Sequence, residues 1–216
     1  MQENSAEAPE KSNFPIIATI IVIAAVMTMI GMGIWQLQRL DEKKALIALY
    51  DANAQKSAIA YPPLGPVQNE NMFRRSSANC LSVIGWQTGS GKDAGGKAGV
   101  RHIAECSTGA EGPGVIILLG IDERPRDNPN WKGGVVSGFI TTEPDKSNIL
   151  QKAFGGKKIL RPMLVSDSPQ AGLRAPARPQ SGDVPNDHLL YAIQWFFFAF
   201  AASVIYILAL RKKLKG

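Results

Sequence analysis

The sequence is poor in the residues that most often carry catalysis or bind metals. Its 216 residues include only two cysteines, Cys80 and Cys106, and two histidines, His102 and His188. No Cys-x-x-Cys or Cys-x-x-x-Cys pair exists, which argues against a redox enzyme or a copper carrier. No base is positioned beside a nucleophile, so we do not expect an enzyme.

Two ligand classes are also disfavoured. The net charge of +6 does not indicate a nucleic-acid surface, because the central part of the chain has no basic helix and no interleaved aromatic residues. The segment Gly91–Ala98 nearly spells a phosphate-binding loop, but Ala98 lacks the hydroxyl that such a loop places on Mg²⁺. We therefore expect Gly85–Gly99 to be a flexible hairpin loop without a nucleotide.

What the sequence does contain is a long apolar run near each end, Ile16–Leu37 and Leu189–Leu210, each of 22 residues without a full charge. As helices they would be about 33 Å long, enough to cross a hydrocarbon core of about 30 Å. Gly33-Ile34-Trp35 stands near the end of the first run in place of a small-x-small cleavage site, so a signal peptide is disfavoured. With no charged residue inside either helix, a transporter or channel is disfavoured too.

The flanking charges predict the membrane and the orientation. The acidic leading tail does not resemble a mitochondrial presequence, so a bacterial inner membrane fits better. The positive-inside rule places the basic end Arg211–Lys215 in the cytoplasm. Arg39, Lys43 and Lys44 argue for the opposite orientation, but charges beside a long translocated segment count for less. We expect a cytoplasmic tail (1–13), a transmembrane helix (14–40), a periplasmic loop (41–187), a second transmembrane helix (188–210) and a basic cytoplasmic tail (211–216).

The loop between the helices begins as a helix over Leu40–Ala60 and then changes to short β-type runs separated by glycine and proline. No long helical pattern alternates with these runs, which favours an antiparallel sheet or a partly closed barrel. The expected class is α+β, with two transmembrane helices flanking a small antiparallel β-rich domain outside the membrane. The expected strands are Cys80–Trp86, Val100–Cys106, Val115–Ile121, Val135–Thr142 and Lys158–Val165.

The two cysteines lie on two of these strands. In an oxidising compartment they could form a disulfide. Their separation in the sequence does not show whether they meet, so a disulfide and two buried free thiols both remain open.

A polar and aromatic cluster borders each apolar run on its inner side. Helical spacing places His188, Tyr191, Ala192 and Trp195 on one face of the second helix. Gln36, Arg39 and Lys43 share a face of the first helix at the same depth, with Trp35 beside them. These residues are also what a membrane-interface belt contains. His188 differs, because a histidine at the edge of a chargeless helix is a candidate for a titrating or metal-ligating role.

These clusters resemble the signatures of the surfeit locus protein 1 family, which end its first membrane helix and begin its second. Phe73-Arg74-Arg75 also looks similar to that family. In the middle, members usually carry Leu-Val-Asn-Arg-Gly-Trp-Val-Pro, whereas residues 117–123 keep only the glycine. The first signature is present as Gly33, Trp35, Gln36, Arg39 and Lys43, and the second as Asn186, His188, Leu189, Tyr191, Ala192, Gln194, Trp195 and Phe196.

The resemblance implies an assembly factor for haem-copper cytochrome c oxidase that helps to deliver haem a to the largest oxidase subunit. His188 would then ligate the iron, and Tyr191 and Trp195 would flank the ring. Arg39 and Lys43 would pair with the propionates, with Trp35 and Gln36 completing the site. The implied partners are oxidase subunits, the haem a synthesis machinery and the lipid bilayer. The alternative is a structural subunit or scaffold of a respiratory oxidase that holds no haem.

Overall fold

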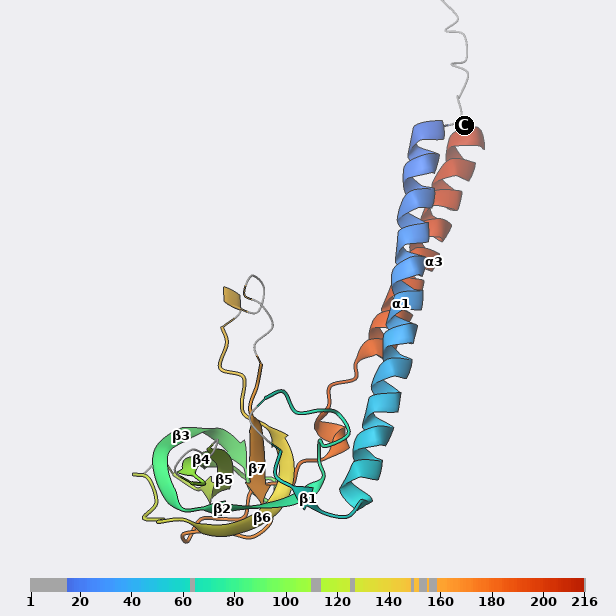
Figure 1. Ribbon diagram of the computed structural model, residues 1–216. Helices are drawn as coiled ribbons and strands as arrows, with labels where there is room; N and C mark the ends of the chain where they lie inside the picture. The colour runs from blue at the N-terminus through green and yellow to red at the C-terminus, as the bar shows by residue number, and fades with distance from the viewer. Residues whose placement is uncertain are drawn as a thin grey trace, which may run out of the picture. The chain divides into compact units, whose positions relative to one another are not determined.

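Figure 1 shows a computed structural model, which describes residues 15–62, 65–109, 114–124, 127–148, 150–151, 155 and 159–215. The chain divides into two compact units. The helical unit comprises the described residues up to Lys44 and from Pro185 onward, and the β unit comprises Ala45–Val184. The acidic leading tail, residues 1–13, and the first residue of the expected strand Lys158–Val165 lie outside the described residues.

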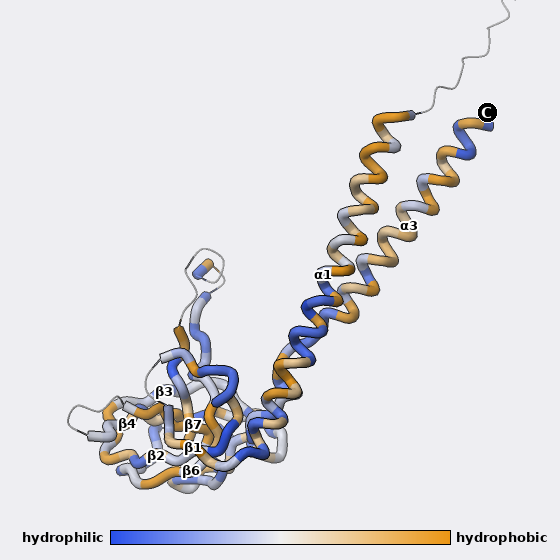
Figure 2. The backbone as a smooth tube through the Cα atoms, turned by 45° about the vertical axis from the view of Figure 1, so that its right-hand side comes forward, coloured by the Kyte–Doolittle hydropathy of each residue, from blue (hydrophilic) through white to orange (hydrophobic). Residues whose placement is uncertain are grey.

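The helical unit is built from α1 (Ile16–Gln55), up to Lys44, and α3 (His188–Lys215). Both helices are long and apolar enough to cross a membrane, judged by length and composition. Figure 2 shows apolar residues along both of them. Large apolar side chains such as Ile20 and Phe200 are exposed there. A helix that is apolar on all sides is typical of a buried or membrane-spanning segment.

Small residues let the two helices approach closely. Ala192 and Ala199 of α3 are only 1% and 5% exposed. A Cβ added to Gly33 of α1 would lie 2.7 Å from the Phe196 ring, so this glycine is what makes room for that ring. Further along the pair, the hydroxyls of Thr19 and Tyr206 lie 2.5 Å apart.

The helix expected over Leu40–Ala60 is a direct continuation of the first apolar helix, and α1 ends at Gln55. Ile59–Ala60 instead forms the short strand β1, so that part of the expectation was wrong. The last turns of α1 belong to the β unit. Asn53 is fully buried there, and its amide donates hydrogen bonds to the carbonyls of Asn69 and Met72 at 2.8 and 3.1 Å. These bonds satisfy a buried polar side chain and hold the helix end against the loop between β1 and β2.

The β unit contains one seven-stranded sheet with the order β1-β2-β6-β7-β5-β4-β3. Most neighbours are antiparallel, but β1 and β2 are parallel, and so are β5 and β7. The sheet is therefore mixed, which corrects the purely antiparallel expectation. After β1, the strands are β2 (Arg75–Cys80), β3 (Ser82–Lys92), β4 (Ala98–Ser107), β5 (Val115–Asp122), β6 (Gly134–Thr142) and β7 (Pro162–Ser166).

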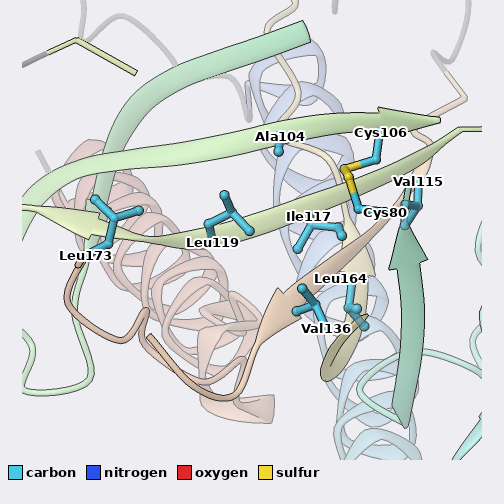
Figure 3. Close-up of a cluster of buried hydrophobic side chains, with 9 residues drawn as sticks. All are labelled: Cys80, Ala104, Cys106, Val115, Ile117, Leu119, Val136, Leu164 and Leu173. Carbon is cyan, nitrogen blue, oxygen red and sulfur yellow. A yellow bond between two sulfur atoms is a disulfide. The ribbon is translucent and has the colours of Figure 1, made fainter. Parts of the chain in front are cut away.

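Strand β5 is the centre of the core, because its residues are buried on both faces. Its alternating side chains enter two separate apolar clusters, as the two-residue period of a strand requires. Figure 3 shows the larger cluster, in which Ile117 and Leu119 pack with Val136 and Leu164. The Cys80–Cys106 disulfide lies in the same cluster. Of the two alternatives for these cysteines, the structure contains the disulfide.

Two further expectations about the strands are corrected. The expected run Cys80–Trp86 is broken, because Cys80 ends β2 and Ser82 begins β3. The expected loop Gly85–Gly99 is strand up to Lys92 and again from Ala98, leaving only a short turn. Its glycines make space for neighbouring side chains. A Cβ on Gly91 would lie 2.9 Å from Cδ1 of Ile121.

The turn between β3 and β4 is closed by Asp93. Its carboxylate accepts hydrogen bonds from the backbone N–H groups of Gly95 and Lys97 at 3.0 and 2.9 Å. Arg174 donates to the other carboxylate oxygen at 2.6 Å. The amides that would face a phosphate in a nucleotide-binding loop are therefore engaged by a side chain of the chain itself. This segment therefore resembles a nucleotide-binding loop in its amino-acid sequence only.

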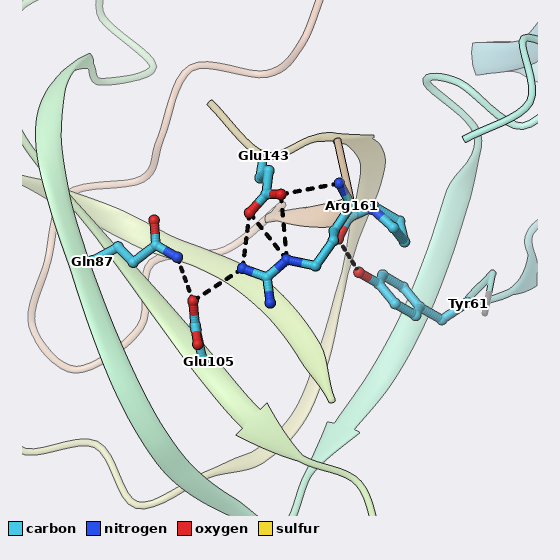
Figure 4. A network of polar contacts seen from close by, with 6 residues as sticks. Tyr61, Gln87, Glu105, Glu143 and Arg161 are labelled. Carbon is cyan, nitrogen blue, oxygen red and sulfur yellow. Dashed lines mark hydrogen bonds and ion pairs between the residues drawn. The ribbon is translucent and has the colours of Figure 1, made fainter. Parts of the chain in front are cut away.

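A second polar cluster joins β3, β4 and the segments beside β6 and β7 (Figure 4). The guanidinium of Arg161 donates to Glu143 at 2.9 Å and to Glu105 at 3.2 Å, and Gln87 also contacts Glu105. The hydrogen bond to Glu143 is the main cause that raises the pKa of Arg161. The Tyr61 hydroxyl donates to the carbonyl of Pro162 at 2.6 Å. These contacts fix the segments around β7 by charge-assisted bonds.

Candidate functional site

The structure joins one residue from each border cluster of the helical unit. Nδ1 of His188, the first residue of α3, lies 2.7 Å from Oε1 of Gln36 on α1. Gln36 is buried although it lies within an apolar helix. Burying an amide is costly unless it is hydrogen-bonded, and the imidazole supplies that bond.

This contact sets the chemistry of the imidazole. An amide oxygen only accepts hydrogen bonds, so Nδ1 of His188 donates its proton to Gln36. In the neutral ring, Nε2 then carries the lone pair. A histidine held through one nitrogen, with the other nitrogen basic, has the arrangement that protein ligands of metals commonly show.

The donor set suits one axial bond to a metal that is already coordinated, rather than a bare ion. Among the described residues, no group of three or more His, Cys, Asp and Glu side chains could hold a metal ion. An iron porphyrin brings four nitrogen ligands of its own and takes its axial ligand from the protein. The single oriented nitrogen of His188 is compatible with such a ligand.

The other polar residues of the first cluster form a separate group on α1. Arg39 donates to Glu42 at 2.6 Å and lies over the Trp35 ring, 5.7 Å from its centroid. The expected propionate-binding role of Arg39 has to compete with Glu42. Lys43 is half-buried one residue further along the helix.

The residues of the second cluster differ in their exposure. Ala192 is buried, whereas Tyr191 is 51% exposed and Trp35 of the first cluster is 43% exposed. Trp195 is half-buried and meets Phe198 edge-on, with ring centroids 6.4 Å apart. The roles expected for Tyr191, Trp195 and Trp35 as walls of a ligand site stay predictions.

Sequence reasoning placed Gln36 at the right depth but did not identify it as the partner of the imidazole. The available signal was a glutamine within an apolar run without full charges, together with the only histidine that borders either run. Phe196 was also missed as the contact of Gly33. That pairing depends on how the two helices are rotated about their axes, which periodicity alone does not fix.

The fold and this site define a class of protein with two apolar helices flanking a β-rich unit and one oriented imidazole between the helices. Such an arrangement is compatible with an inner-membrane protein. The sequence model of the SURF1 family matches residues 23–200, so the chain belongs to the SURF1 family, a family of cytochrome c oxidase assembly factors. Comparison with curated proteins gives no match.

Proposed function

We propose that this protein is an inner-membrane assembly factor that carries haem a to the largest subunit of a haem-copper oxidase. The observation that carries the proposal is the His188–Gln36 hydrogen bond. It supplies an oriented nitrogen at the border of two apolar helices, where an amphiphilic pigment can keep its apolar body in lipid.

Release of the cargo is as important as binding. His188 alone would hold the iron through one protein bond, which the histidines of a receiving subunit could replace. Arg39 and Lys43 would hold the propionates through charge-assisted hydrogen bonds. Tyr191 and Trp195 would flank the macrocycle.

The charges and the cysteines support the proposed compartment. The basic end after α3 includes Lys212, Lys213 and Lys215 and favours a cytoplasmic carboxyl terminus. The disulfide between Cys80 and Cys106 supports an oxidising compartment for the β unit. We therefore propose that both termini are cytoplasmic and that residues 41–187 face the bacterial periplasm.

The decisive experiment is an absorbance titration of the detergent-purified full chain with haem a. Wild type should develop a histidine-ligated spectrum at one haem per chain, and His188→Ala should lose it. Ile193→Ala is the control, because Ile193 is exposed on the same helix and is not one of the signature residues. Binding that His188→Ala leaves unchanged would exclude this ligand.

Co-purification with the oxidase, together with the titration, distinguishes the assembly factor from the alternative function. A scaffold or accessory subunit of the oxidase would bind no haem at any stage and would co-purify with the mature enzyme in equal amounts. An assembly factor should instead be captured mainly with an oxidase that is incomplete. A colourless protein at full stoichiometry would favour the scaffold.

A further inference from the structure

The proposed function does not use Phe73-Arg74-Arg75, the motif at the start of β2. Phe73 has a positive φ of 64°, a conformation that bulky L residues rarely adopt. Its N–H donates to the carbonyl of Ile140 at 2.8 Å, and its buried ring lies 4.9 Å from the Tyr50 ring. Strained residues of this kind concentrate at functional sites, so the surroundings of Phe73 are a candidate functional region.

Two arginines meet at one aromatic ring beside this motif. The guanidinium carbons of Arg75 and Arg178 lie 5.1 and 4.7 Å from the centroid of the Phe139 ring. Phe139 itself is only 4% exposed, so the ring is a fixed support for both cations. Stacking occupies the flat face of a guanidinium and leaves the N–H donors at its edge available for an oxyanion.

The two arginines also line a cavity of about 470 Å³ in the β unit. This volume lies in the range of ligand sites and far exceeds what one small anion needs. The aromatic residues Tyr50, Phe73 and Phe139 form part of its wall. The remaining lining residues are Asp51, Ala54, Gln55, Pro179, Gln180, Ser181 and Gly182.

The charges of this cavity favour an anion. Arg178 has no hydrogen-bond or ion-pair partner among the residues that the structure describes, and Arg75 has only a loose contact of 3.9 Å with Asp167. Asp51, the one acidic residue of the lining, accepts a hydrogen bond from the Ser181 hydroxyl at 2.5 Å. Burial raises the pKa of Tyr50, so its hydroxyl adds no negative charge at neutral pH.

We propose that this cavity binds an acidic peptide segment of a partner protein, with a carboxylate of that segment held between Arg75 and Arg178. Arginine forks match the planar carboxylate, and each charge-assisted bond is about twice as strong as a neutral one. The side chains of Gln55 and Gln180 each offer donors and an acceptor, which suits the alternating N–H and C=O groups of a peptide backbone. This site is separate from the haem proposal and does not depend on it.

The test uses the detergent-purified full chain and a fluorescein-labelled peptide of alternating alanine and glutamate, followed by fluorescence anisotropy at fixed ionic strength. The wild type should bind this peptide and not its glutamine counterpart. Arg178→Gln should weaken binding roughly tenfold or more, since a hydrogen bond to a charged group is lost. Arg178→Lys should restore part of the affinity, because the charge returns without the planar fork.

Arg124→Gln is the matched control, because it removes the same charge from an exposed turn residue that does not line the cavity. Ala54→Gln is a second test of whether the peptide binds in this cavity, and it leaves the net charge unchanged. It places a longer side chain into the cavity from α1 and should weaken binding to a similar extent. Near-ultraviolet circular dichroism of each variant checks that the β unit is folded.

Three results would overturn the proposal. The first is equal binding by wild type, Arg178→Gln and Ala54→Gln. The second is an equal loss for Arg124→Gln, which would reveal a general effect of net charge. The third is no binding of the acidic peptide together with binding of inorganic phosphate or of nanodiscs rich in phosphatidylglycerol, which would assign the cavity to a phosphate or a lipid headgroup.

Discussion

Gln36 and His188, which are 152 positions apart in the sequence, form a hydrogen bond of 2.7 Å. The bond joins the two long helices where their apolar stretches meet their polar borders. It satisfies the buried amide of Gln36 and selects the imidazole tautomer whose Nε2 is free to bind a metal. The contact therefore links the packing of the helix pair to the chemistry proposed for it.

The first prediction follows from this bond. Gln36→Leu replaces the amide with an apolar side chain of similar size. The imidazole then has no hydrogen-bond acceptor, so the ring loses its fixed orientation. We expect haem a affinity to fall about 10- to 100-fold, as for other lost partners of metal-bound histidines. Spectral titration measures this. Gln38→Leu, on the exposed side of the same helix, should bind as wild type. Equal losses for the two variants would contradict the assigned role.

A second prediction concerns the two glycines of α1. A Cβ at Gly33 would meet the Phe196 ring at 2.7 Å, whereas nothing lies within 4 Å of a Cβ at Gly31. Gly33→Ala should therefore force the ring aside and destabilise the helix pair by about 1 kcal/mol or more. Gly31→Ala should be neutral or slightly stabilising. Thermal unfolding in detergent compares them, and Phe196→Leu should rescue Gly33→Ala.

The helices were the most predictable part of the fold. A run such as Ile16–Leu37 needs no tertiary context to be recognised, because its length and lack of charge are sufficient. Strand β5 was equally clear, since it is a continuous β-branched and apolar run. Strand β2 was missed, because Arg-Ser-Ser-Ala-Asn-Cys has neither alternation nor β-branched residues. Its structure depends on pairing with β6 along its whole length.

Other features depend on contacts that no local pattern contains. The parallel pairing of β5 with β7 joins two strands that are separated in the sequence by β6 and its flanking loops. For the candidate site, helical spacing gave the depth and face of His188 and Gln36. Their hydrogen bond required the rotation of each helix about its axis. The cavity beside Phe139 was not predictable, because Arg75 and Arg178 are brought together only by the folded sheet and the chain after it.

A third prediction tests the ionic cluster of Figure 4. In Arg161→Gln the buried carboxylate of Glu143 loses its guanidinium partner. The guanidinium is partly exposed to solvent, so we expect a moderate loss of about 2 kcal/mol in the free energy of unfolding. The double variant Arg161→Gln/Glu143→Gln should recover part of it, because the buried charge of Glu143 is removed together with its guanidinium partner. Lys132→Gln, at an exposed position, serves as the control. Additive effects of the two changes would argue against the pairing.

A fourth prediction concerns alkaline pH. Burial is the main cause that raises the pKa of Tyr61 above its ordinary 10.0, and it raises the pKa of Tyr50 as well. Above about pH 10 the unfolded chain loses these protons while the folded chain keeps them, so stability falls by up to about 1.4 kcal/mol per pH unit for each tyrosine. Below pH 10 this contribution is fully present.

The variant Tyr61→Phe separates this effect from packing. It should cost about 1 kcal/mol at neutral pH, because the buried carbonyl of Pro162 loses its donor. Between pH 10 and 11 its stability should decline less steeply than that of wild type, leaving the slope due to Tyr50. Denaturant unfolding at several pH values measures both quantities. Parallel pH curves for the variant and the wild type would show that Tyr61 does not titrate as a buried group.

The last prediction concerns the disulfide in the core of the β unit. Cys80 and Cys106 are separated by 26 residues, and a crosslink closing a loop of that size stabilises a fold by about 3 to 4 kcal/mol. Cys80→Ala/Cys106→Ala should lose roughly this amount, and Cys106→Ala alone should lose nearly as much, because either change opens the loop. Trp86 and Trp131 pack against the same cluster, so their fluorescence reports the unfolding of this unit directly. If both thiols of denatured, unreduced wild type react with an alkylating reagent, the crosslink is absent and the oxidising compartment proposed for this domain loses its support.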